Sequence, residues 1–210
     1  MKSKLLKYYV VTWTSRSGKL IHNKIIADLV LCFGSKQIFR ANALYSNTTT
    51  QFTVPQITMC STSGEIIDIH VQNNTLVAVA LQFEKTKIET STANVLDYKN
   101  SFEAAKSLID NLPKLDLAYI LVLADGTLVN GSELARCLNQ SVDSKISITG
   151  GLAGDGTNFK STLAGLNNSP KQGLIVATGF YGKGIFVTSG SECGWDKFGP
   201  EKNNYQIRGK

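Results

Sequence analysis

The chain has 210 residues, of which 42% are hydrophobic and only 18% are charged. This length suits one domain or two closely joined halves, and the composition excludes a disordered, charge-rich chain. No apolar run approaches the ~20 residues of a membrane-spanning helix, and residues 1–4 lead into no signal peptide. We therefore expect a cytoplasmic protein that has no membrane contact.

The formal net charge of +6 is concentrated at the two ends of the chain. Residues 1–40 carry a net +7, residues 197–210 carry +3, and residues 41–196 carry −4. A nucleic-acid-binding protein more often spreads basic residues over a folded face, with aromatic residues between them to stack on bases. The pattern favours solvated basic ends, and we expect no nucleic-acid partner.

Cysteine and histidine are few and scattered. The four cysteines, Cys32, Cys60, Cys137 and Cys193, form no CxxC pair, which is typical of buried reduced thiols. The two histidines, His22 and His70, have no ligand-like companion nearby in the sequence. We expect neither a metal site nor a cofactor.

The elements predicted in the first half of the chain are short strands. Aromatic and β-branched residues predict a strand over Lys4–Thr14, and a buried apolar run predicts another over Asp28–Phe33. The remaining predicted strands are Gln56–Cys60, Ile67–Val71, Thr75–Phe83 and Lys85–Thr90. In the third of these six, the strand runs into a loop of small residues, 61–64.

The predicted helices lie in the second half of the chain. Residues 101–112 show an apolar stripe at helical spacing, with Ser101 as the predicted N-cap and Pro113 as the stop. A second helix is predicted from Asn130 or Ser132 to Asn139. Strands are predicted at Leu117–Leu123 and Ile146–Thr149, followed by a hairpin of Leu174–Phe180 and Ile185–Ser189.

These elements predict an α/β fold, with a mixed, mostly buried β-sheet structure and few covering helices. The order of elements also recurs, which allows two pseudo-symmetric halves. Residues 57–60 overlie 146–149 at a shift of 89, and residues 79–88 overlie 176–185 at a shift of 97. Duplication would make the loops after Cys60 and Thr149 face each other, and such a junction is a common place for a small ligand.

The glycine-rich loop of residues 149–156 is the strongest candidate site. Gly150, Gly151 and Gly154, with Ala153 between them, let backbone N–H groups approach an anion without obstruction by Cβ atoms. Asp155 would either order the loop or receive the ammonium group of an amino-acid ligand. The alternative is a plain tight turn between strands.

The loop after the third strand offers a second set of polar groups. Cys60, Ser61, Thr62, Ser63 and Gly64 place a thiol and three hydroxyls at a strand end, where they can bond a ligand. A catalytic set of Cys60 or Ser61 with His70 and Asp68 is the alternative. It requires a nearby base, and the scarcity of histidine disfavours it.

The last predicted strand exits through an aromatic, glycine-rich segment, residues 192–200. Trp195 is its most distinctive residue, and we include it among the candidate ligand contacts. The alternative is that this segment only closes the core.

Four motifs in the same order resemble the N-terminal FIST domain. They are Cys60–Ile66, Val77–Phe83, Gly150–Asp155, and Gly190–Pro200 with its Gly-Trp and Phe-Gly-Pro pairs. The resemblance divides the chain into a basic N-terminal segment with a strand (1–27), a FIST-like domain (28–200), and an exit (201–210) toward a FIST C-terminal or other output domain. It implies a sensory module of signal transduction that is found in prokaryotes and in eukaryotic F-box proteins. It also implies small ligands, amino acids foremost, and it identifies no catalytic residue.

Together these observations predict an intracellular ligand-binding sensor that is not an enzyme. A hydrolase or amidase using Cys60 or Ser61 is the alternative. A protein-interaction scaffold, which would need an exposed apolar patch, is a further class.

Overall fold

The fold was obtained as a computed structural model, which describes residues 1–9, 12–15, 17, 19–40, 44–53, 56–188 and 190. Most strands belong to two sheets, one six-stranded in the order β13-β6-β4-β9-β1-β2 and one four-stranded in the order β10-β14-β11-β12. The six-stranded sheet comprises β1 (Lys2–Tyr9), β2 (Thr12–Ser15), β4 (Leu29–Gly34), β6 (Gln56–Ser61), β9 (Leu76–Gln82) and β13 (Ala164–Leu166). The four-stranded sheet comprises β10 (Lys87–Asn94), β11 (Leu117–Ala124), β12 (Ser147–Leu152) and β14 (Leu174–Tyr181).

The smaller elements are two short strand pairs and the helices. β3 (Ile25–Ile26) pairs with β5 (Phe52–Thr53), and β7 (Glu65–Ile67) pairs with β8 (His70–Gln72). The helices are α1 (Lys36–Arg40), α2 (Leu44–Gln51), the 3₁₀ turn η1 (Val95–Asp97), α3 (Ser101–Asp110) and α4 (Gly131–Ser141). The expected α/β class with few helices is confirmed.

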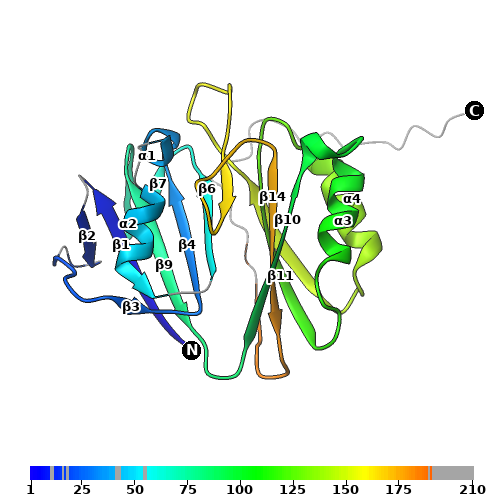
Figure 1. The fold of residues 1–210 in the computed structure, drawn as a ribbon, viewed down its shortest axis with the longest axis horizontal. Helices are drawn as coiled ribbons and strands as arrows, with labels where there is room; N and C mark the ends of the chain where they lie inside the picture. The colour runs from blue at the N-terminus through cyan, green and yellow to red at the C-terminus, as the bar shows by residue number, and fades with distance from the viewer. Residues whose placement is uncertain are drawn as a thin grey trace, which may run out of the picture.

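The two sheets pack face to face, and helices cover their outer faces (Figure 1). Leu29 of the six-stranded sheet lies in one cluster with Tyr119 and Phe180 of the four-stranded sheet. Phe39 of α1 and Leu44 of α2 pack on the other face of the six-stranded sheet. The result is a layered α/β/β/α arrangement in which the central strands β4, β11 and β14 are buried on both faces, as their nearly continuous apolar sequences require.

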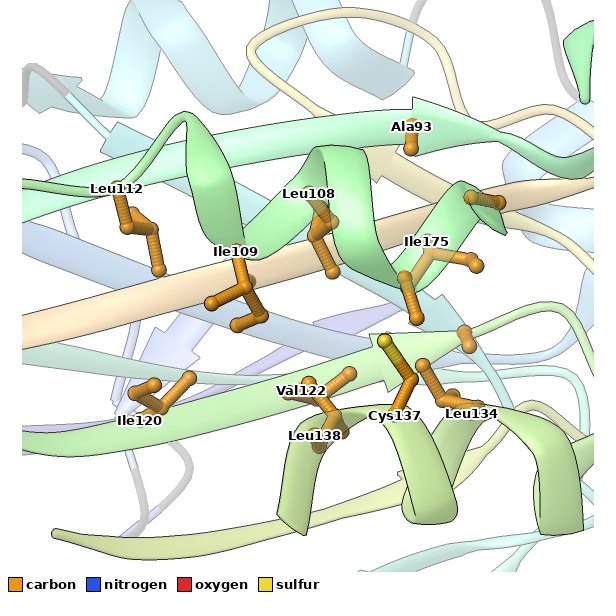
Figure 2. Packing of buried hydrophobic residues seen from close by; sticks show 14 of the residues in the cluster. Ala93, Leu108, Ile109, Leu112, Ile120, Val122, Leu134, Cys137, Leu138 and Ile175 are labelled. Atoms are coloured by element: carbon orange, nitrogen blue, oxygen red, sulfur yellow. The ribbon is translucent and has the colours of Figure 1, made fainter. Parts of the chain in front are cut away.

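The four-stranded sheet shows how strand alternation builds these layers. Alternate residues of β11, including Ile120 and Val122, point toward α3 and α4, where Leu108 and Leu134 meet them (Figure 2). The residues between them, such as Tyr119, pack toward the six-stranded sheet instead. Because successive side chains of a strand alternate between its faces, one apolar run supplies both cores.

The predicted duplication appears in the sheet topology. β4 runs parallel to β6 and antiparallel to β9, and β9 runs antiparallel to β1. In the same way, β11 runs parallel to β12 and antiparallel to β14, and β14 runs antiparallel to β10. The orders β6-β4-β9-β1 and β12-β11-β14-β10 therefore correspond strand for strand, which supports two pseudo-symmetric halves. β1, which lies in the N-terminal segment 1–27, pairs along β9 and is an integral part of the first half.

Several predicted elements differ from those observed. The strand predicted at Lys4–Thr14 is two antiparallel strands, β1 and β2. The strand predicted at Ile67–Val71 is the tight β7–β8 hairpin, which turns at Asp68 with a φ of 55°. No glycine or proline marks either reversal, so each segment was predicted as one continuous strand. Helices α1 and α2 and strand β13 were not predicted.

In the second half of the chain, a helix N-cap, a loop and a hairpin also differ from the prediction. The N-cap of α3 is Asn100, whose side chain accepts a hydrogen bond from Glu103 N, and not Ser101. The predicted loop at 149–156 begins later, because Gly150 and Gly151 lie within β12 and pair with β11. Residues 185–188 form no strand, so the predicted hairpin with Leu174–Phe180 is absent from the described part of the chain.

Candidate functional site

The candidate site lies where loops from the two halves meet. β4 and β6 are parallel, as are β11 and β12, so each pair delivers two loops to the same edge of its sheet. Gly154 N donates to Ser61 O at 2.8 Å, and Ser61 Oγ donates to Gly154 O at 2.8 Å. Gly156 N donates to Ser63 Oγ at 3.2 Å. The expectation that these two loops face each other is therefore supported.

A polar cavity of about 290 Å³ opens beside this junction. Its walls come from the start of α1 (35–37), the loop after β6 (62–65), the turn before β9 (73–74) and the loop after β12 (155–158). Side-chain amides and hydroxyls dominate these walls. The volume lies near the lower end of the ~300–1,000 Å³ range of ligand pockets, so it suits a metabolite of a few heavy atoms.

A buried ion pair joins the two halves at the wall of this cavity. Lys36 Nζ lies 2.5 Å from Asp155 Oδ2, and their side chains are only 10% and 3% exposed. Lys36 Nζ also donates to Ser161 Oγ at 3.0 Å. Burial alone would raise the pKa of Asp155, but hydrogen bonds from Lys36 and from the backbone N–H groups of Ser161 and Lys160 hold it below its ordinary value. The carboxylate is thus ionised and orders the loop.

The structure distributes the predicted site residues over three places. Thr62, Ser63, Gly64 and Asp155 line the polar cavity. Cys60, Ser61, Ala153 and Gly154 lie in the contact between the loops. Gly150 and Gly151 line another hollow of about 240 Å³ between β12 and α4, which has no charged residue in its wall. Trp195 lies outside the described residues.

Cys60 and Ser61 are poorly placed for nucleophilic catalysis. Cys60 is 4% exposed, and burial together with the nearby Asp125 carboxylate raises its pKa to about 12, so the thiol stays protonated. Ser61 is 1% exposed, and its hydroxyl already donates to Gly154 O and accepts from Leu163 N. His70 lies exposed in β8, with no bond to either.

Asp125 has a structural role in the described contacts. Its side chain follows β11 and accepts hydrogen bonds from the backbone N–H groups of Thr127, Leu128 and Gly173. Burial would raise its pKa, but these bonds lower it. Among the residues that the structure describes, no group of three or more His, Cys, Asp or Glu side chains could hold a metal ion.

A family model described as the FIST N domain matches residues 28–203, which is most of the chain. The chain belongs to this family. The FIST N domain is a sensory domain of signal transduction, and the matched span includes every wall of the polar cavity.

No curated protein gave a significant match to the sequence of this chain. Within the part of the chain that the structure describes, no helix is long and apolar enough to cross a membrane.

Sequence reasoning missed several cavity residues outside the two small-residue loops. Lys36, Asn73 and Asn74 belong to none of the motifs noted above, and Glu65, which lies within the segment Cys60–Ile66, was not singled out as a ligand contact. The one usable signal was the end of β4 at Gly34. In a parallel pair of strands, the loop after the first strand lies beside the loop after the second, so residues 35–37 belonged with 61–64.

Proposed function

We propose that this FIST N domain is an intracellular sensor that binds an amino acid or a related small metabolite without catalysis. The polar cavity between the two halves is the observation that carries the proposal. A molecule bound there would contact loops from both sheets, and its occupancy would change how the two halves are held together. A signalling domain needs such a coupling between binding and structure.

The wall chemistry supports a zwitterionic or amide-bearing ligand. Ser63, Asn73, Asn74 and Asn158 supply hydroxyl and amide groups that can donate to a carboxylate or accept from an ammonium group. The hollow beside α4 is lined largely by aliphatic side chains and suits such ligands less well. A further domain, of the FIST C-terminal type or another output domain, would read the occupied state. Neither nucleic acid nor membrane has a role in this proposal.

The hydrolase alternative gains no support from the site. The described nucleophile candidates are buried and hydrogen-bonded, and Cys60 has a pKa far from the value that an attacking thiolate needs. We therefore expect saturable binding and no turnover.

A thermal-shift screen of amino acids and related metabolites tests the proposal. A ligand at ~100 times its dissociation constant stabilises the folded state by ~2.7 kcal/mol, which corresponds to roughly 5–11 °C for a chain of this size. A cavity-filling variant, Thr157→Trp, should abolish the shift, because Thr157 is exposed at the cavity wall. Ser144→Trp, at an exposed position outside the cavity, should retain it. The absence of any shift for the folded wild type would refute the proposal.

A further inference from the structure

Glu65 is a buried carboxylate in the wall of the polar cavity. It begins β7, and the residue is only 2% exposed. Oε1 accepts a hydrogen bond from Thr62 Oγ1 at 2.7 Å. Oε2 accepts from Thr75 Oγ1 at 2.9 Å and from Thr75 N at 3.2 Å. All three donors are neutral, so the carboxylate is held in place without being matched by a positive charge.

Among the residues that the structure describes, the charges around the cavity leave Glu65 without a counter-ion. The walls contain one cation, Lys36, and two carboxylates, Asp155 and Glu65. Lys36 Nζ lies 2.5 Å from Asp155 Oδ2, so the charges of these two side chains cancel. No cationic side chain among the described residues forms an ion pair with Glu65. A buried carboxylate without a cation is costly, and a cationic group entering the cavity would relieve that cost.

The carboxylate keeps one hydrogen-bond acceptor position for such a group. A carboxylate offers about four lone-pair positions, and three neutral donors occupy three of them. An ammonium group has three N–H donors. One can bond Glu65, and the others can bond neutral oxygens of the same wall, such as those of Ser63 or Asn73.

A divalent metal ion fits this site less well than an ammonium group. Calcium takes 6–8 oxygen ligands, commonly with several carboxylates. Glu65 is the only carboxylate in the described cavity wall that is not already paired with a lysine. No described cluster of three or more His, Cys, Asp or Glu side chains lies there to share a metal ion.

We propose that Glu65 binds the primary ammonium group of the small metabolite that this domain senses. The inference rests on the proposed function and adds to it a specificity-determining residue. It also reassigns the expected role of Asp155, because the amine that meets the Asp155 carboxylate is that of Lys36. An amino acid would then place its ammonium group on Glu65 and its carboxylate toward the amide side chains of the cavity.

The test compares amino acids with their 2-hydroxy acid counterparts, for example L-alanine with L-lactate, on the wild type and on Glu65→Gln. Glutamine has the same shape and can keep the network, since its amide oxygen can accept from Thr75 and its NH₂ can donate to a reoriented Thr62 hydroxyl. Glu103→Gln, on the exposed surface of α3, is the matched control. Binding is measured by thermal shift and calorimetry, and the fold of each variant is checked by circular dichroism.

We expect at least one amino acid to bind the wild type at least 10-fold more tightly than its hydroxy acid. Glu65→Gln should lose at least 10-fold in affinity for that amino acid, and Glu103→Gln should not. Equal binding of amino and hydroxy acids by the wild type would overturn the role of Glu65, and this comparison holds even if Glu65→Gln fails to fold. Unchanged amino-acid affinity in a folded Glu65→Gln would also overturn it, yet leave the proposed function intact.

Two further probes separate the inference from the proposed function. If calcium chloride stabilised the wild type but not Glu65→Gln, and no amino acid stabilised either, Glu65 would belong to a metal site and the ammonium site would be overturned. Methylammonium or putrescine binding that depends on Glu65, without amino-acid binding, would support the ammonium site and contradict amino-acid sensing. A wild type that binds neither the amino acids nor the amines would overturn both.

Discussion

Replacing Gly154 by alanine should destabilise the junction between the two halves. A Cβ atom at this position would lie 2.4 Å from Ser63 Oγ, 2.9 Å from Ser63 N and 3.2 Å from Thr62 C. The hydroxyl can rotate away, but the backbone nitrogen cannot, so the loops must separate. They are linked there by the bonds between Gly154 and Ser61 and by the Gly156 N–H on Ser63. Overpacking of this kind costs about 1–3 kcal/mol.

Gly151→Ala is the matched control for this change. A Cβ atom at Gly151 would meet no atom within 4 Å, and its φ lies outside the left-handed region. The sequence alone predicted that glycine was needed at both positions, and the structure requires it only at Gly154. Alanine at 151 should therefore be neutral, or stabilise by up to ~1 kcal/mol through the unfolded chain.

Urea denaturation of the two variants and the wild type provides the measurement. Gly154→Ala should lower the free energy of unfolding by about 1–3 kcal/mol, which corresponds to a loss of roughly 2–12 °C in Tm for a chain of this size. Gly151→Ala should not fall measurably below the wild type. Equal losses in both variants would refute the idea that contact between the loops, and not glycine itself, sets the requirement.

Three other outcomes follow from the charges and thiols of the site. Lys36→Met should lower the free energy of unfolding by about 3–5 kcal/mol in chemical denaturation, because it leaves the Asp155 carboxylate buried and unpaired. A loss below about 1 kcal/mol would mean that the ion pair is solvated. Asp125 and Asp155 both have a folded-state pKa below the ordinary 3.8, so their contribution to stability should be fully present above about pH 5 and should be lost as the pH falls further. A flat acid limb would contradict these shifts. Cys60, with a pKa of about 12, should resist alkylation at pH 8 in the folded state and react after unfolding, as peptide mapping can show; rapid labelling of the native thiol would revive the hydrolase alternative.

The sequence was most informative where a strand is buried on both faces. The strands predicted at 28–33 and 117–123 consist mostly of apolar residues, and their ends agree within one residue with β4 and β11. The sequence signal of the duplication came from other strands, since the segments matched by sequence shift lie in β6 with β12 and in β9 with β14. Burial on both faces leaves a strong apolar signal, so β4 and β11 needed no tertiary information.

The candidate site was harder to predict, because it depends on which loops the fold brings together. Asp155 was recognised, but no sequence pattern links it to Lys36, which lies 119 positions earlier. Glu65 followed a recognised loop and yet looked like an ordinary surface acid. Its burial arises from the β7–β8 hairpin and from Thr75, and the hairpin was predicted as a single strand.

Titration of the ¹⁵N-labelled chain, followed by amide chemical shifts, tests most directly whether the cavity between the halves is the ligand site. The probe is whichever amino acid gives the largest thermal shift. We predict saturable changes concentrated in residues 35–37, 62–65, 73–74 and 155–158, from both halves at one common dissociation constant. Saturable changes confined to residues 131–139 and 148–152 would place the ligand in the hollow beside α4 and contradict a site between the halves.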